Sequence, residues 1–409
     1  MTARQPHSHP IVFMFLILPF GVLSGYVSVS LAYLLSKAGI PVAQVAALVA
    51  ACVIPHTWKF AWAPLIDSVW TRKSWYVLAS VVSAAGIWAT GAVPLTAASL
   101  STLTIVSFLA NVAVTFLGMA TDSLMAYGTP PDLKGRAGGW FQAGNLGGNG
   151  LGGGAGLWLA QRVPNSTASA ILAAACLACC LALFFVPEPA STIRGERVFK
   201  TLGNVLKDVW GVARARLGFL ALVLCLLPIG SGAASNLWSA VAGDWHATAE
   251  TVALVTGVLG GILSAVGCLA GGWICDRMDR KNAYIIYGGL QALCAIGMAL
   301  TPRTPGAYIV FTSLYALITG LTYAGFTAFV LEAMGTGAAA TKYNVFASLS
   351  NTPIYFMTLI DGWAHTRWGP AGMLHTEAVV CLLGMVLFLA FTAMANKVRP
   401  PAAAAEAAA

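Results

Sequence analysis

The residues of this sequence best suited to chemistry are charged side chains inside long apolar segments. Lys59 and His56 lie within the apolar run 42–66, and Asp122 lies within the run 103–127. A charge inside a membrane-spanning helix costs several kcal/mol unless it is paired or wetted, so it points to a binding site or a proton path. His56 and Lys59 are three residues apart and share a helix face. The alternatives for Lys59 are snorkelling to the interface and a fixed structural ion pair.

Asp122 is the expected partner of Lys59, because both lie at a similar depth from the cytoplasmic ends of their helices. A carboxylate opposite Lys59 would stay ionised while paired and would accept a proton once the pair opened, which would couple transport to a proton gradient. Structural pairing alone is the alternative. Glu332, at the end of helix 10, and Asp361, in helix 11, are the acids of the second half. Glu332 falls within one residue of Asp122 under the internal repeat, and a solvated position near the periplasmic end is the alternative for Asp361. The predicted proton-coupling or substrate-binding residues are therefore Lys59, Asp122, His56, Glu332 and Asp361.

The composition explains why these charges stand out. The 409 residues are 58% hydrophobic and 9% charged, with a mean hydropathy of +0.79, whereas soluble domains are roughly 25% charged. Apolar runs of about 20 residues, the length of a spanning helix, recur along the chain. We expect an all-α membrane protein of twelve transmembrane helices; the fifth and eleventh runs are the least apolar, so ten is the alternative count. The predicted spans are residues 11–35, 42–66, 75–93, 103–127, 138–159, 168–186, 217–238, 251–274, 283–301, 306–331, 343–364 and 376–393.

The basic residues predict the orientation. When the loops are assigned alternately to the two sides, most of the 22 Lys and Arg residues fall on the side that holds both termini. Positive loops stay inside, so we expect a multi-pass protein of a bacterial inner membrane with both termini cytoplasmic. This asymmetry accounts for the net charge of +8, so we expect the lipid bilayer, and no nucleic acid, as a partner. The nine cysteines lie in or beside spans without disulfide or zinc patterns, and we expect no cofactor and no metal site.

A repeat divides the chain into halves. Leu18-Pro19-Phe20-Gly21 in the first span matches Leu227-Pro228-Ile229-Gly230 in the seventh, an offset of 209 residues, and residues 63–67 match 272–276 at the same offset. We expect a six-helix half over 1–186, a cytoplasmic linker over 187–216, and a six-helix half over 217–409 that ends in a short disordered tail. Because each half has six crossings, both halves enter the membrane in the same orientation. In such an arrangement the solute site lies between the two halves. The proline and glycine pairs predict breaks in helices 1 and 7.

The stretch that ends the eighth span, Gly272 to Lys281, resembles the loop motif of the major facilitator superfamily: a Gly, an Asp four residues later and clustered basic residues. The first-half version is looser, with Ala63 in place of Gly. The resemblance implies the major facilitator fold and a cytoplasmic gate, in which each Asp meets the positive end of a helix in the opposite half; plain topology signalling is the alternative. The implied gating residues are Asp67, Arg72, Lys73, Asp276, Arg277, Arg280 and Lys281.

Within that superfamily, the segment 54–67 is similar to the second helix of the muropeptide permease and acetyl-coenzyme A transporter group, which includes siderophore permeases. Ala120-Thr121-Asp122 and Ala340-Thr341-Lys342-Tyr343, with Ser348, resemble that group's matching helices. The group pattern has a second acid four residues after the helix 4 Asp, where this chain has Ala126. The absence of this second acid argues against specificity for muropeptides.

Two further spans carry polar faces. The fifth has glycines at four-residue spacing, Gly144, Gly148, Gly152 and Gly156, which indicate close helix packing. Polar side chains in a span must face protein or a water-filled cavity rather than lipid; those beside the glycines are equally suited to joining helices. The predicted pocket-lining residues are Gln142, Asn145, Asn149, Asn351, Thr352 and Tyr355.

These observations predict a secondary active transporter that moves a medium-sized polar or anionic solute by alternating access. The resemblance implies a siderophore or a cell-wall fragment as the solute. Import is favoured because helix 5 lacks the Pro-containing glycine motif of superfamily antiporters, and Lys59 and Asp122 favour proton coupling. An exporter of drugs or metabolites is the alternative. A membrane enzyme should cluster catalytic or metal-binding residues at one interface and a sensor should carry a soluble output domain; the sequence shows neither feature, so we expect no enzyme. The sequence shows no phosphate-binding loop, so ATP-driven pumping is disfavoured.

Overall fold

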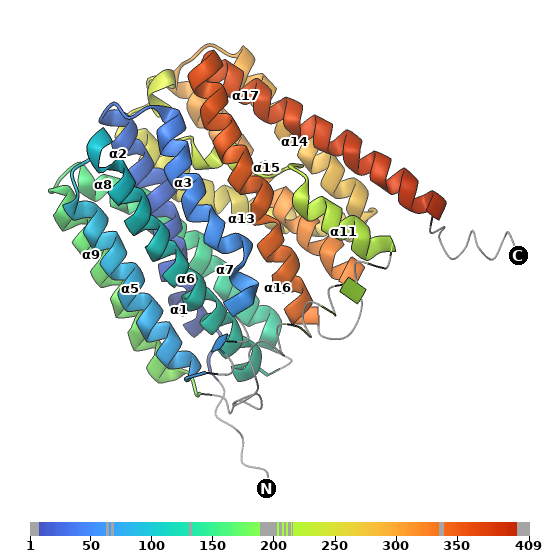
Figure 1. Cartoon of the computed structure of the whole chain (residues 1–409), viewed down its shortest axis with the longest axis horizontal. Coiled ribbons are helices and arrows are strands. Elements are labelled where there is room, and N and C mark those ends of the chain that lie inside the picture. Colours follow the sequence, from blue (N-terminus) through green and yellow to red (C-terminus); the bar gives the residue numbers. More distant parts are fainter. Residues whose placement is uncertain are drawn as a thin grey trace, which may run out of the picture.

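The computed structural model describes residues 8–62, 65–66, 69–130, 133–188, 216–334 and 339–398, together with isolated positions between 203 and 214. Throughout these residues the chain is helical or irregular, and no strand occurs among them. Figure 1 shows the helices of the first half, in blue to green, beside those of the second half, in yellow to red.

The first half contains six crossings, several of them built from more than one helical piece. The bounds are α1 (Val12–Gly25), the π-helix η1 (Tyr26–Leu31) and α2 (Ala32–Lys37); α3 (Val42–Thr57) and the 3-10 turn η2 (Lys59–Trp62); α5 (Arg72–Ala92); η3 (Ala97–Ser99) and α6 (Leu100–Gly128); α7 (Lys134–Gly150), the π-helix η5 (Leu151–Ala155) and α8 (Gly156–Ala160); and α9 (Asn165–Ala178) with the 3-10 helix η6 (Cys179–Phe185).

The second half follows the same plan. Its bounds are α11 (Arg216–Leu226), η7 (Ala233–Asn236) and η8 (Ala242–Trp245); α12 (Ala249–Val252), the π-helix η9 (Ala253–Leu259) and α13 (Gly260–Cys275); α14 (Arg280–Leu300); α15 (Pro305–Met334); and α16 (Ala339–Leu349) with α17 (Asn351–Val398). The chain reverses inside α17 at Gly369, whose φ of 72° only glycine adopts readily, directly before Pro370. The two parts of α17 are therefore the eleventh and twelfth crossings, in orange and red in Figure 1.

The predicted all-α fold of twelve transmembrane helices is confirmed. Among the described residues, eight helices are long and apolar enough to span a membrane, and one of these, Asn344–Met394, holds two crossings. The remaining three crossings do not appear among these long apolar helices for separate reasons. The α-helix of the second crossing is shorter, the fifth crossing is rich in glycine, and the helix of the seventh crossing is broken. Large apolar side chains such as Phe184 and Leu269 are 83% and 78% exposed; such a surface belongs in lipid rather than in water.

The glycines of the fifth crossing pack against the first. A Cβ atom on Gly144, Gly148 or Gly152 would collide with carbonyl oxygens of the first crossing. The Ser30 hydroxyl donates to the Gly152 carbonyl at 2.9 Å and so joins the same two crossings. The predicted packing role of this stripe is confirmed.

Helix 7 breaks where the sequence predicts, because α11 ends at Leu226 and Gly230 and Gly232 follow with φ of 59° and 70°. The predicted break in helix 1 is wrong. Pro19 lies inside the continuous helix α1, and its missing N–H removes only one hydrogen bond. Gly21 serves there as a contact point, since a Cβ would collide with the Asn145 carbonyl.

Contacts between the halves gather near the ends opposite the basic loops, the side predicted from the charge pattern to face the periplasm. Ser36 Oγ donates to the Ala240 carbonyl at 2.5 Å, and the Arg162 and Glu250 side chains lie 4.0 Å apart. The first part of α17 lies along α3, and Gly362 packs so closely on Ala46 that a Cβ would not fit. The halves are therefore in contact on this side of the protein.

Candidate functional site

The second crossing changes its helical form at the centre of the candidate site. The helix α3 ends at Thr57, Trp58 has φ of −121°, and a 3-10 turn begins at Lys59. Pro55 and Pro64 flank this point in the sequence, and neither has an N–H with which to continue an α-helix. The predicted span 42–66 therefore changes from an α-helix to a 3-10 turn at this point. The change of form leaves Lys59, half-buried, at the start of the new turn.

The ammonium group of Lys59 lies near an aromatic ring and interacts with a carboxylate. Its Nζ atom is 5.7 Å from the centre of the Phe20 ring, which is within cation–π range. Lys59 and Asp122 are close enough to interact electrostatically, as the sequence predicts. In the described chain, however, they do not form a direct ion pair within 4.0 Å.

His56 also contacts the Phe20 ring. The two rings meet edge to face with centroids 5.2 Å apart, and His56 Nε2 lies 3.3 Å from Asn111 Oδ1. The Asn111 amide nitrogen already donates to the Ser107 carbonyl at 2.9 Å, so its oxygen accepts and His56 Nε2 donates. His56 therefore has a fixed orientation within the first half.

The second half reaches this site through Asn351. Its Nδ2 atom donates to the His56 carbonyl at 3.4 Å, an oxygen that the end of α3 leaves without a helical partner. Asn351, predicted to line the pocket, thus joins the eleventh crossing to the break in the second. Asn149 instead donates to Ser24 Oγ at 3.4 Å, within the first half. Of the other predicted lining residues, Asn145, Thr352 and Tyr355 are half-buried and Gln142 is exposed.

The predicted gating residues of the first half lie where α5 begins. Arg72 is buried, and its Nε atom donates to Ser123 Oγ at 2.6 Å. The Glu188 carboxylate accepts from the backbone N–H groups of Arg72 at 3.1 Å and of Lys73 at 3.2 Å. A carboxylate is favoured at a helix N-terminus, so Glu188 ties the end of the sixth crossing to α5. Asp67 lies outside the described residues.

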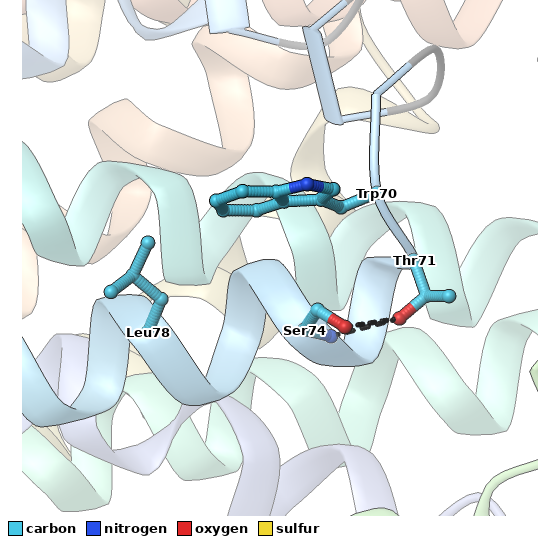
Figure 2. A pocket seen from close by; sticks show the side chains of 4 residues that line it. All are labelled: Trp70, Thr71, Ser74 and Leu78. Atoms are coloured by element: carbon cyan, nitrogen blue, oxygen red, sulfur yellow. Dashed lines mark hydrogen bonds between the residues drawn. The ribbon is translucent and has the colours of Figure 1, made fainter.

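Figure 2 shows the same helix start from close by. Thr71 caps α5, since its Oγ1 accepts from the Ser74 N–H at 3.0 Å, and the Trp70 ring lies above this turn. The shallow pocket formed by Trp70, Thr71, Ser74 and Leu78 is on the outer surface, where Trp70 is 58% exposed. A tryptophan in this position is typical of a membrane interface anchor.

In the second half the gating residues are arranged in a related way. Arg280 Nη1 lies 3.4 Å from Glu332 Oε2, and both side chains are partly exposed. Glu332 and Ser123 are equivalent positions in the repeat, because they are 209 residues apart. Arg72 contacts this position in the first half and Arg280 contacts it in the second half. Arg277 stacks on Trp273 at 3.8 Å. Among the described residues, Asp276 forms no salt bridge with the opposite half, so the gate stays a prediction.

The sequence matches the model of the Major Facilitator Superfamily over residues 11–354. The chain belongs to the Major Facilitator Superfamily. It is similar to the anhydromuropeptide permease of Escherichia coli (strain K12), with 25% identity over 358 residues that cover 82% of this chain and 70% of the permease. This superfamily member is therefore a multi-pass membrane transporter and not an enzyme.

Solved structures support the fold of this superfamily transporter. It aligns with a D-xylose-proton symporter at a TM-score of 0.73 and 13% identity, over 93% of this chain and 97% of the symporter. The nucleoside transporter NupG aligns at a TM-score of 0.70 and 13% identity, over 93% of this chain and 98% of NupG. At such identities the likeness shows the shared fold alone.

Sequence reasoning missed two polar groups of this transporter. Asn111 on α6 orients His56, and Ser107, Asn111 and Thr115 at four-residue spacing form a polar face that indicates it. Glu377 is buried beside Asp361 in the second half. In the sequence, Glu377 is the second residue of an apolar run. An acid in that position is equally typical of a helix end exposed to water, so the sequence alone does not indicate burial.

Proposed function

We propose that this transporter imports a medium-sized polar or anionic solute across a bacterial inner membrane together with protons, with both chain termini cytoplasmic. The observation that carries the proposal is the half-buried Lys59 at the change of helical form in the second crossing. Lys59 forms no direct ion pair with another described residue, and an ammonium group of this kind in a membrane span is suited to binding an anionic group of a solute. Asn351 brings the other half to the same turn, so a solute held there is sensed by both halves.

For the solute itself we propose a cell-wall fragment that carries sugar rings and a peptide carboxylate. The similarity to the anhydromuropeptide permease supports this class. Lys59 would bind the carboxylate, while Phe20 and Trp62, which stacks on Phe116 at 4.6 Å, offer flat apolar faces to the sugar rings. A siderophore with anionic oxygens is the second class that Lys59 would accept.

Proton coupling is proposed to act through Lys59 and Asp122. A solute carboxylate bound to Lys59 neutralises the charge that Asp122 faces and leaves one negative charge in excess. Unpaired charge is costly in a site removed from bulk water, and a proton bound at Asp122 restores neutrality. Solute and proton would therefore bind and leave together, which is the requirement for symport.

The experiment measures uptake of radiolabelled anhydromuropeptide into proteoliposomes with an imposed proton gradient. A charged hydrogen bond is worth about 1.5–3 kcal/mol, so Lys59→Ala should weaken solute binding by about tenfold to a hundredfold. Lys37→Ala removes an exposed lysine at the end of α2 and is the matched control. Equal uptake by the Lys59→Ala and control proteins would remove Lys59 from the site, and uptake of a labelled siderophore alone would replace the proposed solute.

A further inference from the structure

The second half holds a pair of buried carboxyl groups at the inner face of its last two crossings. Asp361, in the first part of α17, is 0% exposed, and Glu377, in the second part, is 3% exposed. The two carboxyl groups lie close enough to interact electrostatically. Tyr315 of α15 donates its hydroxyl to Glu377 Oε1 at 2.8 Å, so three crossings meet at this point.

The hydrogen-bond inventory of the pair indicates a missing donor. In the described part of the chain, no donor reaches either Oδ atom of Asp361 or the Oε2 atom of Glu377. Two ionised carboxylates accept hydrogen bonds but donate none, and they repel each other when placed in contact. One proton between them replaces the repulsion with an O–H···O hydrogen bond and leaves the pair with a single negative charge.

We propose that Asp361 and Glu377 share one proton and form the proton-binding site of the second half, with the Tyr315 hydroxyl fixing the pair. This inference rests on the proposed proton-coupled transport and adds a second acidic site to the Lys59–Asp122 site. It assigns a role to Glu377 and Tyr315, which lie on crossings separate from that site.

Asp361 of the acid pair is next in sequence to a close contact between the two halves. Gly362, the residue after Asp361, packs against Ala46 of α3 without room for a side chain. A change in the charge of the pair therefore acts on the helix that closes the periplasmic side. Loss of the shared proton would restore the repulsion between the two parts of α17 and favour a rearrangement of this contact.

A polar route leads from the pair toward the periplasmic surface. His365 is four residues after Asp361 and therefore on the same helix face. Its Nε2 atom lies 2.7 Å from Asp244 Oδ2, and the two side chains are 14% and 31% exposed. This imidazole and carboxylate are able to pass a proton inward from solvent.

Several crossings contribute groups near the pair, and the Cys381 thiol itself donates to the Gly288 carbonyl of α14. Besides Tyr315, the twelfth crossing presents the Cys381 thiol and the eleventh presents His365, while Trp238 of the seventh packs edge-on to Tyr315 at 5.2 Å. The α3 helix contributes apolar residues at the Gly362 contact. Among the described residues, no Lys or Arg forms a salt bridge with either acid, so the proton is the counter-charge available to the pair.

The test is infrared difference spectroscopy of the purified full-length protein in lipid, recorded in H2O and D2O. A shared proton gives a carboxylic C=O band that shifts in D2O, and Asp361→Asn or Glu377→Gln should abolish it. Tyr315→Phe should keep the band and move it to higher frequency, because one hydrogen bond is lost. Glu250→Gln removes an exposed acid, 79% accessible, and is the control. A spectrum without the band, or a band unchanged in both acid variants, would overturn the proposal.

A transport measurement separates a proton site from a structural role. Glu377→Gln is expected to retain solute exchange across the membrane at equal concentrations and to lose accumulation driven by a proton gradient. Accumulation equal to that of the unsubstituted protein would contradict the proposal. The infrared test needs no solute, so a wrong choice of solute and a wrong assignment of the acid pair give different results.

Discussion

Replacing Gly362 by alanine perturbs the contact between the second and eleventh crossings. A Cβ atom at this position would collide with the Ala46 Cβ atom and lie 3.2 Å from the Ala43 Cα atom, so the helices must separate for it to fit. Overpacking of a close contact costs about 1–3 kcal/mol. The cost falls on the state in which the halves meet on the side predicted to be periplasmic, so the ratio of closed to open forms should fall by about 5- to 150-fold.

The assay uses a thiol introduced by Ala240→Cys in a protein whose nine native cysteines have been replaced. Ala240 is 3% exposed, and its carbonyl accepts a hydrogen bond from Ser36 across the two halves. A membrane-impermeant maleimide added from the periplasmic side should therefore label it slowly, and Gly362→Ala should accelerate labelling.

Gly147→Ala is the matched control, because an added Cβ atom there has nothing within 4 Å. It introduces the same methyl group into another membrane helix without a collision. Equal labelling rates in the Gly362→Ala and Gly147→Ala proteins would refute the reasoning that the Gly362 contact holds the periplasmic side closed.

Three further predictions concern stability, each measured as thermal unfolding of the purified protein in detergent. Glu188→Gln should lower stability by about 0.5–2 kcal/mol, because the carboxylate caps the start of α5; an unchanged melting temperature would remove that role. Gly230→Ala should cost about 1–2 kcal/mol, since φ of 59° disfavours a side chain, whereas Gly272→Ala, which meets no atom within 4 Å, should cost nothing measurable. Glu332→Gln should change stability by less than about 1 kcal/mol, because its pair with Arg280 is partly exposed; a larger loss would show a role beyond this surface pair.

The fold follows from features that act along the sequence. Apolar runs of spanning length and the repeated Leu-Pro-x-Gly element identify the helices and relate the halves, because lipid demands long apolar helices whatever their neighbours. The same element was a poor guide to local geometry. Around Gly230 the backbone turns to positive φ, whereas Gly21 stays helical and packs on the fifth crossing. Which of these occurs depends on the facing helix.

The candidate site was predictable only in part. Lys59, His56 and Asp122 stand out because an intramembrane charge is costly in any helix, and the structure brings these residues together. The link between Asn351 and the His56 carbonyl spans 295 positions and depends on the shape of the α3 end. The contact of Glu377 with Asp361 likewise depends on the reversal at Gly369 and on the packing of α15. Contacts between residues so far apart in the sequence depend on how the helices pack, and the sequence alone does not predict them.

The central claim is that one solute moves with protons through the Lys59–Asp122 site. The most direct test is proton uptake into proteoliposomes on addition of anhydromuropeptide, compared among the unsubstituted protein, Lys59→Ala, Asp122→Asn and the Lys37→Ala control. Solute-dependent proton uptake is expected in the unsubstituted and Lys37→Ala proteins and should be lost in the other two. Solute uptake without proton movement, or proton movement that survives both site substitutions, would contradict it.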